Sequence, residues 1–433
     1  MDGSSPLQAP PVDTAGLCAF LERVGAPRRL LLAISGGADS MALMRLAAPL
    51  NADGRFQISV ATVDHQLRAG ARAEADLVAR CAKALGLGHA ILSWAGAKPS
   101  SGLQAAARHA RYRLLIDHAG ATGAQALLTA HHADDQAETV FMRLQRGSGP
   151  RGLAGMAETS LVAAGAGARL ALLRPLLGVR RRELRRLMTD AGADFVDDPS
   201  NDDVAYQRVR VRRLIDRLER DGALSVAALL DAAAACRSVA DRIETVENAR
   251  FAELGGAFDA SGGVWLGAAM LAVDDAPLVA RLVRAVGGGD HGPDAAASGG
   301  ALATALSGRL ATLGGTMLAR RGDQLMIFRE PAGVLGRAGV DPVPPLPLAA
   351  GETALWDGRF IIANPFDGPA SVRPFGASPD AAALPAEERR RLAAAPAFWR
   401  GADYVAFAAE TGAATPLAEE RFFQRVNRFA EIT

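Results

Sequence analysis

The sequence has few cysteines. Only three of its 433 residues are cysteines, at positions 18, 81 and 236. Cys18, Cys81 and Cys236 are far apart and form no CxxC pair. The sequence therefore predicts neither a disulfide framework nor a zinc or iron–sulfur site.

Excess charge is also lacking. The chain has 48 basic and 47 acidic residues, a formal net charge of +1. It is therefore no polycation, and any surface for nucleic acid must be local. Lys83 and Lys98 are the only lysines, so nearly all basic residues are arginine. Because this preference for arginine over lysine indicates a compositional bias, the number of arginines alone is weak evidence for function.

Long hydrophobic runs are absent as well. No apolar stretch approaches the length needed to span a membrane, and the N-terminus shows no basic segment followed by an apolar one. We therefore expect a cytoplasmic protein. The length predicts two or three domains, and 49% hydrophobic with 22% charged residues is typical of a globular chain.

The sequence is organised around an apolar run followed by a glycine turn. Residues 30–34 read LLLAI, which is short and apolar enough for a buried strand, and SGGADS follows at 35–40. Glycines let a backbone approach an anion closely, and the first amides of a helix attract it. The stretch predicts a phosphate-binding loop, although an ordinary strand-to-helix turn would use similar residues.

The spacing of this loop narrows its class. No lysine follows, which excludes GxxxxGKS/T, and GxGxxG is absent. SGGADS resembles instead the SGGxDS loop of the N-type ATP pyrophosphatases, which cut ATP between its α- and β-phosphates. The resemblance implies that Asp39 helps to hold Mg²⁺. It implies an ATP-binding loop of Ser35, Gly36, Gly37, Ala38, Asp39 and Ser40.

Apolar segments alternate with helix-like segments at the start of the chain, which predicts an α/β fold with a doubly wound, mostly parallel sheet. In such sheets ligands bind at the carboxyl ends of the strands. Three polar clusters begin where predicted strands end. Their shared position predicts a site even without matching any of them to a known motif. The clusters are SGGADS, DHQLR at 64–68 and HHADDQAET at 131–139.

The last cluster carries a carboxylate pair. Asp135 and Glu138 are three residues apart, so on a helix they share one face. They could cap the helix, ligate Mg²⁺ or hold an ammonium group. His131 and His132 could be a metal pair, but adjacent side chains diverge and no third ligand with zinc-type spacing follows. Phosphate or nucleotide contacts are therefore favoured for these histidines.

Taken in order, the motifs are similar to those of the bacterial tRNA(Ile)-lysidine synthetase family. SGGxDS alone is shared with GMP, NAD and asparagine synthetases and with tRNA thiolases, so the ordered set carries the resemblance. It is close over about the first half of the chain and thinner afterwards. The set is SGGADS, VDHQLR, ARHARY, HHADDQAET, RGSGPRGLAGM and DPSN.

The resemblance implies a reaction. ATP adenylates the C2 oxygen of the wobble cytidine in an isoleucine tRNA with a CAU anticodon. The side-chain amine of free lysine then attacks C2 and expels AMP, which gives lysidine. The resemblance leaves a homodimer open.

It also implies roles for single residues. Asp39 would support Mg²⁺ and ATP, Arg111 would assist adenylation or the lysine step, and Asp135 with Glu138 would hold the α-amino group of lysine. A carboxylate pair suits that cation. The implied ATP contacts outside the loop are His65 and His131.

An arginine-rich stretch follows. An apolar strand is expected to end at 174–177, and a helix with five arginines opens at 180–186. After the DPSN turn, the family usually has an RNRIR-like run where this chain has RVRVR at 208–212. The role of Val209 is therefore open, whereas Arg208 aligns with an arginine expected near the target cytidine. A solvated arginine face is the alternative, but beside DPSN we predict tRNA contacts by Arg208 and Arg212.

The second half predicts further domains. A tRNA acceptor-stem contact by the last of them follows from the resemblance alone. We expect a catalytic domain at 1–222, a mainly helical tRNA-binding domain at 223–331, a Pro-rich linker at 332–347 and a small mixed or β module at 348–433.

Three other functions fit parts of the pattern. A tRNA thiolase would need a cysteine pair or an iron–sulfur cluster. A small-molecule synthetase of the amidotransferase type would need an ammonia source or an N-terminal cysteine nucleophile. A non-catalytic nucleotide- or RNA-binding relative is disfavoured by four intact residues, Asp39, Arg111, Asp135 and Glu138.

Overall fold

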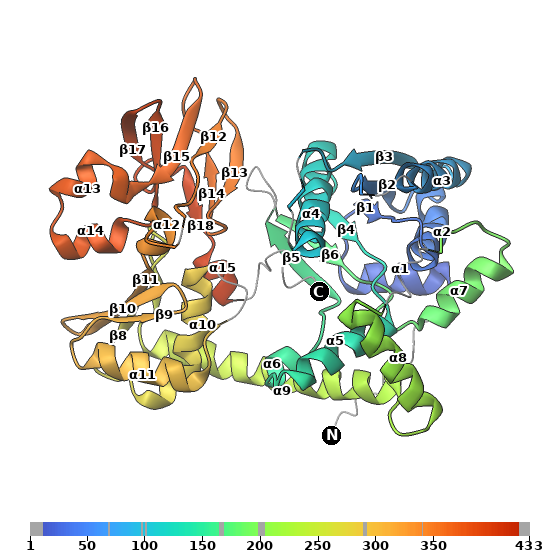
Figure 1. Ribbon diagram of the computed structural model, residues 1–433, viewed down its shortest axis with the longest axis horizontal. Coiled ribbons are helices and arrows are strands. Elements are labelled where there is room, and N and C mark those ends of the chain that lie inside the picture. The colour runs from blue at the N-terminus through green and yellow to red at the C-terminus, as the bar shows by residue number, and fades with distance from the viewer. Residues whose placement is uncertain are drawn as a thin grey trace. The chain divides into compact units, whose positions relative to one another are not determined.

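The structure is a computed structural model that describes residues 12–423 except 68–69, 97, 100–101, 164–168, 198–203, 289–291 and 340 (Figure 1). These residues form two compact units, the first made of 12–162 and 169–242 and the second of 243–423 with Ala163. The division into four segments that we expected from the sequence, with boundaries near 222, 331 and 347, stays a prediction. Arg68 of the VDHQLR motif and all four residues of DPSN, 198–201, lie outside the described residues.

The first unit is built on a six-stranded sheet in the order β3-β2-β1-β4-β6-β5. The pairs from β3 through β6 are parallel, so the predicted mostly parallel α/β sheet is confirmed. Leu30, Leu31 and Leu32 are all buried, because both faces of the central strand are covered. The strands are β1 (Arg29–Ala33), β2 (Gln57–Asp64), β3 (Gly88–Ser93), β4 (Ala126–Leu128), β5 (Thr159–Ala163) and β6 (Arg169–Leu173).

The helices of this unit follow the apolar periodicity of the sequence. Met41 and Leu43 of α2 are buried against the central strands. The helices are α1 (Thr14–Arg23), α2 (Ala38–Ala52), α3 (Ala71–Ala84), α4 (Leu103–Thr122), α5 (Ala133–Gln145), α6 (Pro150–Leu153), α7 (Arg181–Asp190), α8 (Gln207–Arg220) and the first part of α9 (Val226–Glu253).

One strand ends earlier than the sequence suggests. We expected the apolar segment to end at 174–177, but β6 ends at Leu173. Pro175 has no backbone N–H for a sheet ladder. Leu176 and Leu177 are buried outside any strand, which explains why the segment reads as one. Strand β5 was not predicted.

The second unit contains antiparallel sheets. A five-stranded sheet in the order β7-β8-β11-β10-β9 accompanies the helices, where the sequence predicted only a strand pair. Its elements are β7 (Ala257–Phe258), β8 (Val264–Gly267), η3 (Val273–Asp275), α10 (Ala276–Gly287), α11 (Ala295–Leu306), β9 (Ala311–Leu313), β10 (Thr316–Arg321) and β11 (Gln324–Arg329).

The C-terminal part of this unit has two smaller sheets, β12-β15-β16-β17 and β13-β14-β18. This confirms the predicted small mixed or β module. Its elements are α12 (Ala332–Leu335), β12 (Leu346–Leu348), β13 (Thr353–Trp356), β14 (Phe360–Ala363), β15 (Ala370–Pro374), η4 (Phe375–Ala377), α13 (Pro379–Ala383), α14 (Ala386–Leu392), β16 (Pro396–Arg400), β17 (Asp403–Phe407), β18 (Ala414–Pro416) and α15 (Ala418–Phe422).

Helix α15 completes the core around α10. Phe422 is fully buried, and its ring centroid lies 4.7 Å from that of Phe251 and 5.8 Å from that of Phe258. The Arg281 guanidinium lies 4.2 Å from the centroid of the Phe422 ring. The last helix is therefore part of the same hydrophobic core as residues more than 150 positions earlier in the chain.

We expect Phe422→Ala to lower the free energy of unfolding by about 3–5 kcal/mol, the usual cost of an empty aromatic site in a core. Urea unfolding followed by circular dichroism measures this. Leu310→Ala is the control, because Leu310 is 41% exposed, and its effect should stay within about 0.5 kcal/mol. Equal small effects of the two variants would contradict a structural role for α15.

Candidate active site

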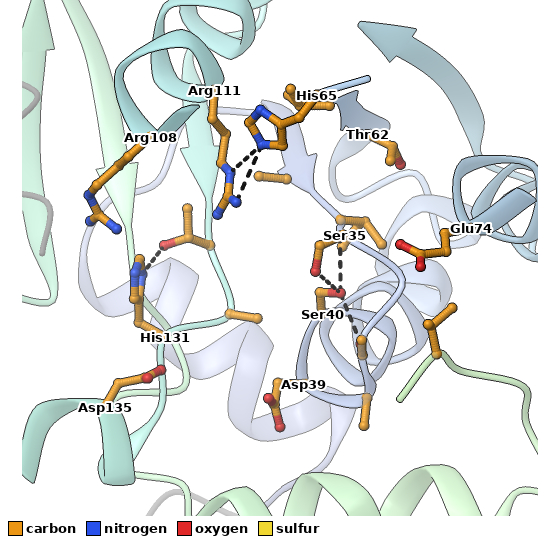
Figure 2. Close-up of a pocket in the computed structure, with 18 of the residues that line it drawn as sticks. Ser35, Asp39, Ser40, Thr62, His65, Glu74, Arg108, Arg111, His131 and Asp135 are labelled. Atoms are coloured by element: carbon orange, nitrogen blue, oxygen red, sulfur yellow. Dashed lines mark hydrogen bonds between the residues drawn. The ribbon is translucent and has the colours of Figure 1, made fainter. Parts of the chain in front are cut away.

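A pocket of about 540 Å³ lies at the carboxyl ends of β1, β2 and β4 (Figure 2). Each polar cluster that follows one of these strands contributes to its lining. Helices α4, α7 and α8 contribute arginines from other parts of the first unit. Among the residues predicted for a site, those that line this pocket are Ser35, Gly37, Ala38, Asp39, Ser40, His65, Arg111, His131, Asp135, Arg208 and Arg212.

The loop between β1 and α2 is held by its two serines. The Ser40 hydroxyl accepts from the Ser35 N–H at 3.2 Å and donates to the Gly37 carbonyl at 2.9 Å. Gly36 has a φ of +93°, which L-residues with a side chain rarely adopt. Gly37 is the N-cap of α2, so the free amides of the first turn begin at the pocket. This geometry suits an anion.

Asp39 lies in the first turn of α2 and faces the same pocket. Its Oδ1 atom is buried and has no hydrogen-bond partner among the described residues. Its Oδ2 atom lies 3.5 Å from His132 Nε2 and 3.8 Å from Arg181 Nε. A buried, unpartnered carboxylate oxygen beside an anion-binding loop fits Mg²⁺, which prefers oxygen ligands and usually also binds substrate phosphates.

The described residues contain no group of three or more His, Cys, Asp or Glu side chains placed to hold a metal ion.

His65 and Arg111 meet across the pocket. Arg111 Nε donates to His65 Nε2 at 3.4 Å, as Figure 2 shows. Burial and the positive charge of Arg111 lower the pKa of His65 to about 4. The imidazole is therefore neutral at pH 7 and can accept from the guanidinium.

His131 and His132 point to different partners, as expected for adjacent residues. His131 Nδ1 lies 2.8 Å from the Thr129 hydroxyl, and burial lowers the pKa of His131 to about 3. His132 is the N-cap of α5, and its Nδ1 accepts from the Asp135 N–H at 3.2 Å. Burial opposes charge on His132, but Asp135 and Asp39 outweigh it and raise its pKa.

The lowered pKa of His131 makes the fold acid-sensitive. In the unfolded chain histidine binds its proton near pH 6.5, but in the folded chain His131 binds it only near pH 3. Its contribution to stability is therefore complete above pH 6.5 and is lost as pH falls toward about 3. We expect His131→Asn, which can still hydrogen-bond to Thr129, to lower the midpoint of acid unfolding. His109→Asn, on the exposed face of α4, should leave it unchanged. A midpoint unmoved by His131→Asn in a fluorescence titration would contradict this assignment.

The predicted carboxylate pair is divided between two environments. Asp135 lines the pocket and also caps α5, since its Oδ2 accepts from the His132 N–H at 3.2 Å. Burial opposes the charge on Asp135, but His132 and Arg208 outweigh it and lower its pKa. Asp135 therefore remains a carboxylate and serves both as the predicted helix cap and as a pocket residue.

Glu138 is 1% exposed and lies between two arginines. Its Oε2 accepts from Arg208 Nε at 3.0 Å, and its Oε1 accepts from Arg212 Nε at 2.6 Å. Glu138 lines a second pocket of about 530 Å³, and Arg212 lines both pockets. The three residues thus form an ion cluster between the pockets, which we call the Glu138 triad.

Comparisons with known proteins agree with this geometry. A PP-loop domain family matches residues 15–218. The tRNA(Ile)-lysidine synthase of Methylobacterium nodulans is 42% identical over 345 residues, which cover 75% of this chain and 97% of the relative. That of Ruegeria pomeroyi is 36% identical over 390 residues, 88% of each chain.

The chain belongs to the tRNA(Ile)-lysidine synthase family. This confirms the resemblance drawn from the ordered motifs, and the PP-loop match implies the use of ATP. The solved U34-tRNA thiolase NcsA of Methanococcus maripaludis is only 16% identical, with a TM-score of 0.42, over 51% of this chain and 76% of that chain. So distant a likeness bears on neither fold nor function here.

Within this family member, the structure adds pocket residues that the sequence analysis did not assign to a site. Arg108 precedes Arg111 by three positions on α4, and Arg181 with Arg185 forms an i,i+4 pair on α7. Helical spacing relative to an assigned residue could have found Arg108. No local signal could have placed α7 beside Asp39. The added residues include Arg108, Thr129, Arg181 and Arg185.

Two predicted residues do not line this pocket. Gly36 shapes the loop through its backbone, and its carbonyl accepts from the Val196 N–H at 2.9 Å. Glu138 faces the second pocket. The roles predicted for individual site residues otherwise stay predictions.

Proposed function

We propose that this chain ligates free lysine to C2 of the wobble cytidine in the isoleucine tRNA with a CAU anticodon. The observation that carries the proposal is the family membership, which names the reaction of the relatives. The pocket supports it, because an anion-binding loop, an unpartnered carboxylate oxygen and a set of arginines face one space. We further propose that the enzyme works in the cytoplasm.

The first step is adenylation of the tRNA. Oxygen O2 of cytidine attacks the α-phosphorus of ATP, and the bond to the β-phosphate oxygen breaks to release pyrophosphate. Residues 35–40 would bind the leaving phosphates through backbone amides and serine hydroxyls. Asp39 would help to hold Mg²⁺, which would supply positive charge to the leaving group. Arg111, kept in place by neutral His65, would add charge near the α-phosphate, and His131 would contact the nucleotide.

The second step is attack by lysine. Its ε-amine attacks C2, the bond from C2 to the adenylated oxygen breaks, AMP leaves and the nitrogen loses a proton. Asp135 would hold the α-amino group, as its ionised state in the pocket allows. Glu138 would join it only if Arg208 or Arg212 gives up its contact in the Glu138 triad.

That requirement links the lysine site to the tRNA. Arg208 and Arg212 are the arginines we propose to contact tRNA phosphates. A phosphate that attracts either guanidinium would weaken its pairing with Glu138 and free the carboxylate for an ammonium group. Charge would in this way couple tRNA binding to lysine capture.

The larger assembly is proposed on the same basis. The second unit would grip the tRNA, with its C-terminal module at the acceptor stem, and two chains would form a homodimer. No helix in the described part of the chain is long and apolar enough to cross a membrane. Light scattering with and without tRNA measures how many chains associate and how many tRNA molecules they bind.

The test is incubation with ATP, Mg²⁺, labelled lysine and either isoleucine or elongator methionine tRNA, both with CAU anticodons. We expect label in the isoleucine tRNA, as lysidine in the nucleoside digest, with one AMP and one pyrophosphate per lysine. Label transfer that needs no ATP, or sulfur incorporation in place of lysine, would refute the proposal.

A further inference from the structure

The guanidinium of Arg108 faces the active-site pocket. Arg108 lines the pocket from α4, and its Nε and Nη2 atoms are buried with no hydrogen-bond partner among the described residues. Its Cζ lies 5.4 Å from the centroid of the buried Tyr112 ring. Burial lowers the pKa of Arg108, but an arginine stays protonated at pH 7.

Leaving such a group unpaired is costly. A buried charge normally acquires a counter-ion or a full set of hydrogen bonds, because its hydration is lost. Asp135 is near enough to influence Arg108 electrostatically, but no ion pair joins them within the described chain. Arg174, which is 1% exposed and hydrogen-bonded to Ala157 and Ser160, adds further positive potential. The site therefore suits an anion that comes with the substrates.

Two substrates carry anionic groups, ATP and the amino acid. In Figure 2, Arg108 lies on the same side of the pocket as His131 and Asp135, while Ser35 and Ser40 of the phosphate loop lie on the other side. An amino acid is a zwitterion, so its head group needs a cation and a carboxylate side by side. Arg108 and Asp135 supply that pair, and a guanidinium matches a carboxylate through two parallel hydrogen bonds.

We propose that Arg108 binds the α-carboxylate of free lysine while Asp135 binds its α-amino group. This inference rests on the proposed function and adds the group that distinguishes an amino acid from a simple amine. With the α-amino group held by Asp135, the ε-amine is the free nucleophile, so the same contacts determine which nitrogen attacks. Arg108 is a substrate-binding residue in this assignment.

Arg108→Met tests the proposal, with Arg113→Met as the control, since Arg113 lies exposed on the same helix and outside the pocket. Three amines are compared with adenylated tRNA, namely L-lysine, L-lysinamide and 1,5-diaminopentane. The wild type should have a higher kcat/KM for L-lysine than for L-lysinamide or 1,5-diaminopentane. Arg108→Met should lower kcat/KM for lysine by on the order of 100-fold, the scale of charged hydrogen bonds, and leave that for diaminopentane unchanged.

Pyrophosphate release without lysine measures the first step separately. It should be unchanged in Arg108→Met, whereas a comparable loss there would assign the arginine to an ATP phosphate and overturn the proposal. Equal losses for lysine and diaminopentane would overturn it too. Arg108→Lys keeps the positive charge but loses the paired N–H donors of the guanidinium. It should retain part of the preference for lysine, and it serves as the test if Arg108→Met folds poorly. A wild type that uses lysine but shows no such selectivity refutes this inference alone, while a wild type that never uses lysine refutes the proposed function with it.

Discussion

Asp39→Asn is expected to slow pyrophosphate release severely while the fold survives. The substitution keeps the size of the side chain and removes the charge of the buried Oδ1 atom, which has no partner among the described residues. Metal-assisted stabilisation of a leaving phosphate is worth several kcal/mol, so we expect a loss of roughly 1,000-fold in kcat/KM for ATP. Pyrophosphate release from ATP in the presence of tRNA and excess Mg²⁺ measures it.

The fold should tolerate this change. The contacts of Asp39 Oδ2 with His132 and Arg181 are long, at 3.5 and 3.8 Å, and Asp135 continues to support the charge of His132, so we expect the free energy of unfolding to fall by only about 1 kcal/mol. Asp190→Asn is the matched control, because Asp190 is exposed on α7 and pairs there with the exposed Arg186. Pyrophosphate release at the wild-type rate by Asp39→Asn would remove Asp39 from the metal site.

Glu138→Gln is expected to have two separable effects. The first is on stability, because Arg208 and Arg212 lose the carboxylate that pairs with both of them. Breaking a buried ion cluster from one side costs roughly 3 kcal/mol when the remaining charges are partly exposed, as both arginines are here. Urea unfolding should show this loss without any ligand.

The second effect is on chemistry. If Glu138 helps Asp135 to hold lysine, the adenylated tRNA should still form in Glu138→Gln, and its conversion to lysidine should slow by a factor of about 10–100. Single-turnover assays that follow pyrophosphate and lysidine separately distinguish the two steps.

A double variant isolates the role of the ion cluster. Glu138→Gln combined with Arg212→Gln removes one charge of each sign and should recover much of the stability. If it also recovers lysidine formation, Glu138 acts only through the Glu138 triad. If conversion of the adenylated tRNA stays slow, the carboxylate itself serves lysine. Equal slowing of both chemical steps would instead assign Glu138 to ATP or to the helix.

The sequence by itself determined the parallel centre of the sheet and the edge at which the pocket lies. Leu30–Leu32 read as a buried strand because a central parallel strand is apolar on both faces, and that local pattern needs no tertiary information. Because the polar residues that follow β1, β2 and β4 come at the carboxyl ends of these strands, their position at one edge could be predicted. The ordered motifs were enough to find the family.

Only the tertiary structure decided which charges meet. Asp135 and Glu138 are three residues apart and looked equivalent, yet Asp135 lines the first pocket and Glu138 lies between arginines of α8, 70 and 74 residues away. Arg108 looked like one arginine among many until burial left its Nε and Nη2 atoms without a hydrogen-bond partner among the described residues, on the same side of the pocket as Asp135 (Figure 2). Local spacing fixes which face of a helix a side chain occupies, but the partner and the loss of hydration depend on elements distant in sequence, and these set the charge balance of the site.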